Sequence, residues 1–324
     1  MMSDITSKEL IKSLQKGIQF LVDKQMHSGE FATLNWKQNN VESASYVKSV
    51  FFTSFILHSL KYSKKSITVK IISQNALNFL SNEMEINGFW RYSGKGSFIH
   101  FDMDTTSSVL SSVKEWGIEL DYQTLASSLL KYRNKQGLFY TWILDTEQPF
   151  TKKDNNIDWV VNANILFFYS LMNIPLPKVE KYLIHIVKSG KFKKRSPYYD
   201  SPFTFIYCLT RVYSDGNNSR IISIIPKIRD YLRNIINENK SFYSQLENAL
   251  VAVSLLNCGY TNIELRLTLK YLLNLQRKDG GWSMGSFHTG GPYLGYDTFY
   301  GSDALTTAIA LEAISKYLKK NLND

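Results

Sequence analysis

The feature of this sequence that most constrains its fold is an alternation of two kinds of helical segment along the whole chain. Apolar residues recur at three- and four-residue spacing in about twelve segments, and almost no segment shows the alternating pattern of a strand. One kind is amphipathic, with Lys, Asn and Ser on one side, which predicts helices that face water. These segments begin near Ser7, Ile67, Asp121, Lys178, Ile221 and Asn262.

The second kind of segment is apolar nearly all round apart from small residues, which predicts buried helices. One such segment follows each amphipathic segment, and they begin near Ala44, Asp104, Asp158, Ser201, Tyr243 and Ser302. Helical hairpins that repeat every 40 to 60 residues or so are typical of ring-shaped or solenoid proteins. We therefore predict an all-α fold, an (α/α)6 barrel or toroid of six hairpins, and because no linker divides the chain we expect residues 1–324 to form one domain.

The turn from each outer helix to its inner helix also repeats. Five of the six junctions carry Gly followed closely by an aromatic residue, at 28–31, 87–90, 136–139, 189–192 and 279–282. The sixth junction, at 239–242, lacks the Gly. We expect the Gly to take the left-handed conformation that ends the outer helix, and the aromatic side chain to pack beneath the neighbouring hairpin.

In such a ring all six inner helices run the same way, so their N-terminal ends meet at one mouth, where we expect the ligand site. Helix dipoles and unpaired N–H groups favour an anionic ligand or a carboxylate there. Aromatic residues gather near these helix starts, and a ring face stabilises a cation by about 0.5 to 2 kcal/mol when both are desolvated. The predicted walls of the site are Trp90, Trp142, Tyr198, Tyr199, Tyr293, Tyr296 and Tyr300.

Several polar residues occur at the same helix starts. Asp158, Asn162 and Asp303 are candidate binding residues. Because Asp is also a favoured N-cap, the alternative is that Asp158, Asp303, Asp104 and Asp200 each only cap a helix.

Two kinds of motif in the sequence resemble those of a known superfamily. Residues 273–282, LNLQRKDGGW, resemble the QW-type repeat of squalene cyclases and protein prenyltransferases, and 79–90 and 20–31 resemble further copies. Residues 102–106, DMDTT, are similar to the acid motif of class II terpene cyclases, and match most closely the Asp-x-Asp-Thr-Thr variant of drimane-type sesquiterpene cyclases. The resemblance implies an enzyme that cyclises a linear isoprenoid or isoprenyl diphosphate.

The resemblance also implies residue roles. Such cyclases protonate a terminal alkene, let the cation propagate through folded double bonds, and quench it by proton loss or water. Asp104 would be the proton donor and Asp102 its partner, while Thr105 stands where the better-known motif has a third Asp. Because an alkene is a very weak base, the acid must be a neutral carboxyl whose pKa is raised by burial and a neighbouring carboxylate. His100 would reload or orient the acid, or stand by without a role.

No cofactor is expected for this chemistry. Mg²⁺ would enter only with a diphosphate substrate, which Arg91 and Lys95 would hold unless they are ordinary surface residues. The chain has no Asp-Asp-x-x-Asp cluster, which argues against magnesium-dependent ionisation of a diphosphate. Cys208 and Cys258 lie inside apolar helical patterns, which argues against the zinc site of protein prenyltransferases and indicates no metal.

Two other classes of function stay open. One is a non-catalytic toroid that binds an isoprenoid or a peptide. The other is a carbohydrate-active (α/α)6 enzyme, with Asp104 and either Asp303 or Asp200 as the two carboxylates. The pair Asp102 and Asp104 favours a protonating enzyme over a binding protein, because a protein that only binds has little use for two carboxylates in an apolar site.

The net charge of +10 is spread along amphipathic segments, which is typical of a solvated surface. It is also compatible with peripheral contact to an anionic membrane or with an anionic substrate. Nucleic acid is disfavoured, because the chain has no zinc-finger spacing, basic zipper or RNP-type strand. We expect a cytoplasmic protein for three reasons. The chain has only two cysteines, its N-terminus is polar, and it has no apolar stretch long enough to span a bilayer.

Overall fold

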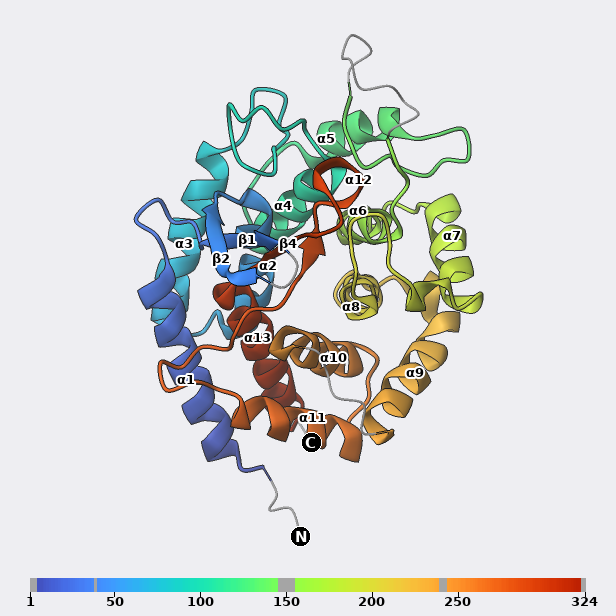
Figure 1. Cartoon of the computed structure of the whole chain (residues 1–324). Coiled ribbons are helices and arrows are strands. Elements are labelled where there is room, and N and C mark those ends of the chain that lie inside the picture. The colour runs from blue at the N-terminus through green and yellow to red at the C-terminus, as the bar shows by residue number, and fades with distance from the viewer. Residues whose placement is uncertain (1–4, 38–39, 145–154, 239–243, 322–324) are drawn as a thin grey trace.

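The computed structural model describes residues 5–37, 40–144, 155–238 and 244–321. Within them twelve helices form two concentric rings, so the predicted (α/α)6 toroid is confirmed (Figure 1). The outer helices are α1 Ser7–Lys24, α3 Ile67–Asn82, α5 Tyr122–Leu129, α7 Pro177–Lys188, α9 Ile225–Asn237 and α11 Ile263–Asn274. The inner helices are α2 Val50–Leu60, α4 Met103–Glu115, α6 Trp159–Leu171, α8 Pro202–Ser214, α10 Gln245–Asn257 and α13 Asp303–Asn321.

The inner ring is closed by packing of each inner helix on the next, with α13 packed on α2. Every residue of α2 is buried, and α6 is buried from Trp159 to Ser170. By contrast, the outer helix α9 buries only Ile225, Ile228 and Leu232. The two kinds of segment in the sequence therefore correspond to the two rings, because an inner helix is covered on all sides and an outer helix on one.

The hydrophobic periodicity did not indicate the short strands that accompany the helices. Four strands form an antiparallel sheet in the order β2-β1-β4-β3. Because residues 40–47 belong to β2, the first inner helix begins at Val50 rather than near Ala44. The strands are β1 Thr33–Lys37, β2 Asn40–Val47, β3 His288–Thr289 and β4 Thr298–Gly301. The sheet joins the first and last hairpins of the chain, beside the short helix α12 Gly291–Leu294 (Figure 1).

The five Gly residues of the repeated turn all have positive φ, as predicted: Gly29, Gly88, Gly137, Gly190 and Gly280. Their place differs from the prediction, however. Gly190 lies two residues beyond the end of α7, directly after the C-cap Ser189, whereas Gly280 lies six residues beyond the end of α11. Most of these residues therefore form a tight turn between the helices rather than the cap of the outer helix.

A repeated hydrogen bond fixes the aromatic residue that follows each of four turns. Its backbone N–H donates to a side-chain oxygen in the first turns of the next inner helix. The donor and acceptor pairs are Phe31 with Thr53, Trp90 with Thr106, Phe139 with Asn162, and Trp282 with Thr307. These bonds tie the outer and inner halves of a hairpin together at the mouth of the ring.

Two of these aromatics make a further matched contact. The indole Nε1 of Trp90 donates to the carbonyl of Leu80 at 2.7 Å, and that of Trp282 donates to Leu272 at 2.8 Å, in each case ten residues earlier. Both rings are fully buried. Trp90 is therefore a structural residue of its repeat, like Trp282.

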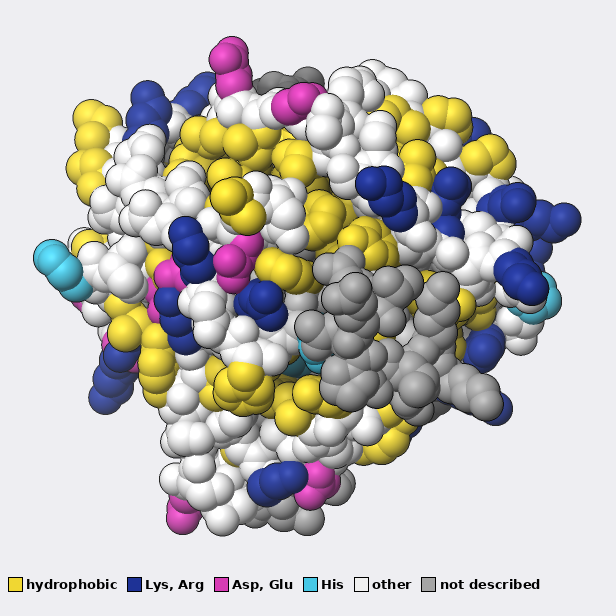
Figure 2. Space-filling view, turned by 90° about the horizontal axis from the view of Figure 1, so that it is seen from above, with side chains coloured by type: hydrophobic (Ala, Val, Ile, Leu, Met, Phe, Trp, Pro, Cys, Tyr) yellow, Lys and Arg dark blue, Asp and Glu magenta, His cyan; other side chains and the backbone are white. Residues whose placement is uncertain are grey.

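Positive charge is dispersed over the face of the molecule that is seen from above (Figure 2). Figure 2 shows Lys and Arg side chains scattered among acidic and hydrophobic ones on the face seen from above. None of the helices in the described ranges is both long and apolar enough to cross a bilayer.

Candidate active site

A cavity of about 670 Å³, measured with its open mouth, lies at the N-terminal ends of the inner helices. Its lining comes from the first turns of α2, α4 and α6, from the loops that precede α4, α6 and α8, and from the sheet and α12. Five of the seven predicted aromatic walls line it: Trp142, Tyr198, Tyr199, Tyr293 and Tyr300. Asp102, Asp104 and Thr105 line it as well.

Helix capping places the two carboxylates. Asp102 is the N-cap of α4, and its Oδ1 accepts the backbone N–H of Thr105 at 2.6 Å. Asp104 is the second residue of the helix and is 8% exposed. Asp104 is therefore not a cap, and its carboxyl group faces the cavity.

Both oxygens of Asp104 accept a hydrogen bond. The Nδ2 of Asn164 on α6 donates to Oδ1 at 2.6 Å, and the hydroxyl of Tyr199 donates to Oδ2. Asn164 is itself held by Arg211 on α8, whose Nη2 donates to the amide oxygen at 2.8 Å. Because a guanidinium only donates, it turns the NH₂ group of Asn164 toward Asp104.

Arg211 is 3% exposed and lies among aromatic rings. Its guanidinium carbon is 4.5 Å from the ring centroid of Phe55 and 4.8 Å from that of Phe167. Ring faces compensate part of the hydration that a buried cation loses. A series of hydrogen bonds thus connects the buried guanidinium of Arg211, through the Asn164 amide, to the carboxyl group of Asp104.

Burial raises the pKa of both carboxyl groups. The pKa of Asp104 is raised to about 7, against the hydrogen bonds from Asn164 and Tyr199, which lower it. The pKa of Asp102 is also raised to about 7, by burial first and by the nearby charge of Asp104, against the backbone N–H of Thr105. Neutral carboxyl groups are therefore available at the cavity near neutral pH.

Two polar atoms beside the acid make no hydrogen bond within the described residues, the Oδ2 of Asp102 and the Oγ1 of Thr105. A buried carboxylate oxygen without a donor is unfavourable when it carries charge. This arrangement favours the protonated form of Asp102.

The sheet supplies a neutral imidazole to the cavity. The Nδ1 of His288 on β3 lies 3.1 Å from the carbonyl oxygen of Thr289, and its Nε2 lies 3.0 Å from the hydroxyl of Tyr92. Because a carbonyl only accepts, Nδ1 carries the proton and Nε2 accepts from Tyr92. Burial lowers the pKa of His288 to about 4, and the imidazole stacks on Tyr300 at 4.6 Å.

Several predicted binding residues lie outside the cavity lining. Arg91 pairs with Glu85 at 3.1 Å and covers the ring of Phe101. The exposed Tyr296 stacks under Arg195. Trp90 and His100 also lie outside the lining.

The remaining predicted polar residues have structural roles. Asp158 is the N-cap of α6 and accepts hydrogen bonds from the Ser196 hydroxyl at 2.6 Å and the Tyr198 N–H at 2.9 Å. Asn162 holds the backbone of Phe139, as described above. Asp303 pairs with Arg277 at 2.8 Å, away from the cavity lining.

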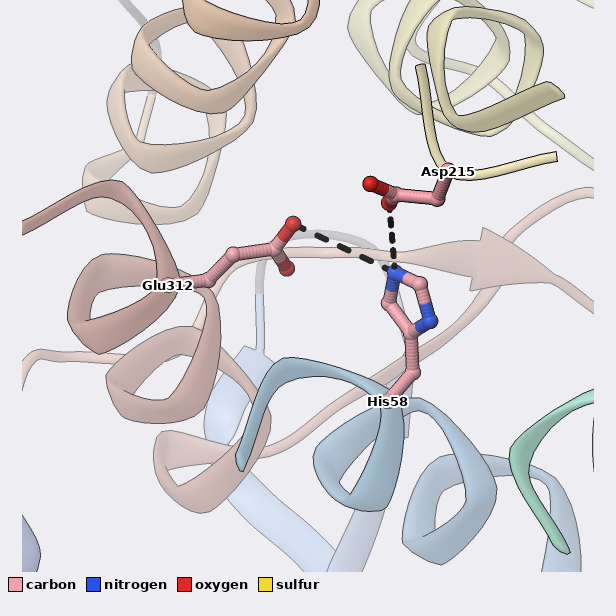
Figure 3. Close-up of side chains that lie close together, drawn as sticks. All are labelled: His58, Asp215 and Glu312. Atoms are coloured by element: carbon pink, nitrogen blue, oxygen red, sulfur yellow. Dashed lines mark ion pairs between the residues drawn. The ribbon is translucent and has the colours of Figure 1, made fainter. Parts of the chain in front are cut away.

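A second group of polar side chains lies toward the C-terminal ends of α2 and α8. The Nε2 of His58 is 3.6 Å from Asp215 and 4.0 Å from Glu312, and the three are of types that bind metals (Figure 3). The ammonium group of Lys316 lies 3.0 Å from Glu312, and that of Lys61 lies 3.5 Å from Asp215. Because these ammonium groups already compensate the carboxylates, we assign the group a structural role.

Comparison with known proteins gives a likeness of fold. No protein-family model and no curated protein matches the sequence. Type II terpene cyclase MstE from Scytonema superposes with a TM-score of 0.73 at 13% identity, covering 97% of this chain and 99% of that one. A variant of that cyclase was solved in complex with geranylgeranyl dihydroxybenzoate, described as its substrate.

Other solved structures share the toroid. A protein from Actinoplanes has a TM-score of 0.71 at 15% identity, covering 95% of this chain and 99% of that one. A possible member of the GH105 family from Salmonella enterica has a TM-score of 0.62 at 12% identity, covering 99% and 96%. At these identities the likeness concerns the fold, and function has to be argued from the site.

Proposed function

We propose that the protein is a class II terpene cyclase that protonates an alkene of a linear isoprenoid, with Asp104 as the general acid. One observation carries the proposal: a buried carboxyl group with a raised pKa faces an aromatic-lined cavity from the first turn of an inner helix. A toroid that only binds a lipid has no need to keep such a group dry, because burying a carboxyl is unfavourable.

The site suits the first step of the reaction. Asp104 gives its carboxyl proton to one carbon of the terminal alkene, the π electrons form the new C–H bond, and the other carbon becomes a carbocation. The carboxylate that remains accepts hydrogen bonds from Asn164 and Tyr199, and Arg211 polarises the Asn164 amide. These interactions strengthen as negative charge develops, so they favour the transition state over the ground state.

The walls suit the steps that follow. The ring of Trp142 contacts those of Tyr198 and Tyr293, at centroid distances of 6.1 and 5.5 Å. Their faces stabilise a cation that moves along the folded chain. A cavity lined in this way also orders the chain and keeps water from the intermediate.

The cavity indicates which part of the substrate it holds. None of its described lining residues is Lys or Arg, and Arg91 is paired elsewhere. We propose that the cavity holds the isoprenoid part and that the chemistry needs no metal. The substrate named for MstE, geranylgeranyl dihydroxybenzoate, is an isoprenoid on an aromatic head.

The carbohydrate alternative has a likeness of fold through the GH105 structure, but the site does not favour it. Glycoside hydrolysis needs two carboxyl groups on opposite sides of the scissile bond. Neither Asp303 nor Asp200, the expected partners of Asp104, lines the cavity. Asp102, which does, lies on the same helix start as Asp104.

Replacing the acid tests the proposal. The purified protein is incubated with geranylgeranyl dihydroxybenzoate, farnesyl and geranylgeranyl diphosphate, and squalene, and products are identified by mass spectrometry. We expect a cyclised product from the wild type and a loss of about 10²- to 10⁴-fold or more in Asp104→Asn, because a positioned acid contributes this much. Asp303→Asn is the matched control, since Asp303 begins another inner helix outside the cavity lining.

The control is expected to keep wild-type product levels. Binding of these isoprenoids without any product, unaffected by Asp104→Asn, would contradict the proposal and favour a binding toroid.

A further inference from the structure

We propose that Tyr92 and His288 together accept the proton whose loss ends the cyclisation, an inference that rests on the proposed function. A cyclisation that begins by protonation leaves a carbocation at its end. If that cation is to become an alkene, a group lining the cavity must take a proton from a neighbouring carbon. Among the described residues that line the cavity, Tyr92 and His288 form a hydrogen-bonded pair that includes a basic ring nitrogen.

The first argument is the hydrogen-bond geometry of the pair. The Nδ1–H of His288 is committed to the carbonyl of Thr289, so the lone pair lies on Nε2 and accepts the hydroxyl of Tyr92 at 3.0 Å. Both side chains line the cavity. The hydroxyl oxygen of Tyr92 can therefore accept a proton from the cation while its own proton passes to Nε2.

The second argument is the position of the pair relative to the acid. Tyr199 separates the two, since its hydroxyl donates to Asp104 while its ring lies 6.1 Å from the imidazole of His288. His288 comes from β3, which pairs with Tyr300 of β4, whereas Asp104 comes from α4. The proton donor and the proton acceptor thus enter one cavity from different elements.

The third argument is the chemistry of the surroundings. Phe51 and Tyr300 surround the imidazole with aromatic rings, at centroid distances of 5.8 and 4.6 Å. These rings stabilise the imidazolium that forms. Burial lowers the pKa of His288, so the imidazole is neutral before the reaction and readily releases the proton afterwards.

The step balances without a further reactant. The C–H bond beside the cationic carbon breaks, its electrons form the new C=C bond, and the proton goes to the Tyr92 oxygen as the Tyr92 proton goes to His288 Nε2. Nothing is oxidised or reduced. The imidazolium then releases its proton to solvent, and the Asp104 carboxylate regains one.

Two variants test the inference through the product mixture. His288→Gln keeps an acceptor for Tyr92 but lacks the basic nitrogen, and Tyr92→Phe removes the hydroxyl. With the four probes named above, we expect the ratio of cyclised alkene to hydroxylated or prematurely released products to fall about 10²-fold in both, because a positioned base contributes this much. Total substrate consumption is measured alongside this ratio, because consumption reports the first protonation by Asp104 whereas the ratio reports how the cation ends.

Tyr296→Phe is the matched control, because Tyr296 lies outside the cavity lining and its ring stacks under Arg195. Thermal unfolding of each variant shows that it is folded, and Tyr92→Phe carries the test alone if His288→Gln is not. A wild-type product ratio in the folded variants would overturn the inference while leaving the proposed function intact. A wild type that forms no cyclised product would overturn the proposed function and this inference with it.

Discussion

Asp104 combines two opposing influences on one carboxyl group. Burial favours the neutral acid, whereas Asn164 and Tyr199 donate hydrogen bonds that favour the anion. A group placed in this way keeps its proton up to about pH 7 and yet leaves a stabilised carboxylate when the proton is transferred. The raised pKa of Asp104 therefore arises from burial in the folded ring, against the hydrogen bonds from its neighbours, and the motif alone does not determine it.

The pH dependence of the rate follows from this balance. In the proposed mechanism the active form carries the proton on Asp104, whose pKa is about 7, so we expect the cyclisation rate to be highest below pH 7 and to fall as the pH rises through about 7. His288, with a pKa of about 4, is neutral throughout this range and adds no second transition. Initial rates between pH 5 and pH 9 measure the profile, and a rate that rises through pH 7 would exclude Asp104 as the acid.

Asn164→Leu tests whether the hydrogen bond from Asn164 stabilises the Asp104 carboxylate, through the pH dependence of the rate. Removing the amide removes a hydrogen bond that lowers the pKa of Asp104, so the fall in rate should move to higher pH. The maximal rate should also drop, by about tenfold to a hundredfold, because a hydrogen bond to a charged group contributes roughly 1.5–3 kcal/mol. An unchanged profile would show that Asn164 does not act on the acid.

Among individual residues, the sequence predicts the pair Asp102 and Asp104 but not the side chains that donate hydrogen bonds to Asp104. Asn162 and Asn164 are both conspicuous in an apolar segment, yet Asn162 holds the Phe139 backbone and Asn164 holds Asp104. Residues two apart lie on opposite sides of a helix. Which side faces the cavity depends on how α6 packs in the ring, and one sequence does not contain that rotation.

At the scale of elements, the repeated turn is defined by its glycines. Gly280 has a φ of 91°, and a Cβ there would lie 2.4 Å from the backbone oxygen of Lys16 on α1. Gly259 has a φ of 73° with open space around it. The turn at Gly280 thus needs glycine both for its conformation and for the approach of the first outer helix.

We expect Gly280→Ala to be clearly more destabilising than Gly259→Ala. Both variants carry the left-handed strain of about 1–2 kcal/mol, and only Gly280→Ala adds a clash with backbone. Midpoints of thermal unfolding compare the two. Equal shifts would mean that the turn does not depend on close contact with α1.

The sheet is the element that sequence periodicity could not predict. β1 pairs with β4, which brings residues near 35 beside residues near 300. Such pairing leaves no local signal, and β2 is mostly exposed and so lacks an alternating apolar pattern. His288 was missed for the same reason, since its position over the cavity depends on β3 and β4.

At the scale of the molecule, the two ends of the inner ring differ in character. The N-terminal ends surround an apolar cavity, whereas a charged network lies toward the other end, where Lys61, Lys316 and Arg211 balance Glu115, Asp215 and Glu312. Burial would raise the pKa of Asp215, but Lys316 and Lys61 lower it below its usual range. The network joins α2, α4, α8 and α13 across the interior of the ring.

Removing one cation from this network should destabilise the whole ring. Lys316→Met leaves Asp215 and Glu312 without a cation that contacts both, which we expect to cost about 3–5 kcal/mol. Lys319→Met, on the exposed side of the same helix, should change stability by less than about 0.5 kcal/mol. Thermal unfolding compares the pair, and similar midpoints would show that the buried charges do not stabilise the ring.

Isotope labelling from solvent tests most directly whether cyclisation begins with a proton from Asp104. The carboxyl proton exchanges with water, so in D₂O the wild type should form a cyclised product that carries one deuterium at the carbon first protonated. Asp104→Asn should form none. A cyclised product without deuterium, or the same labelled product from Asp104→Asn, would contradict protonation by this residue.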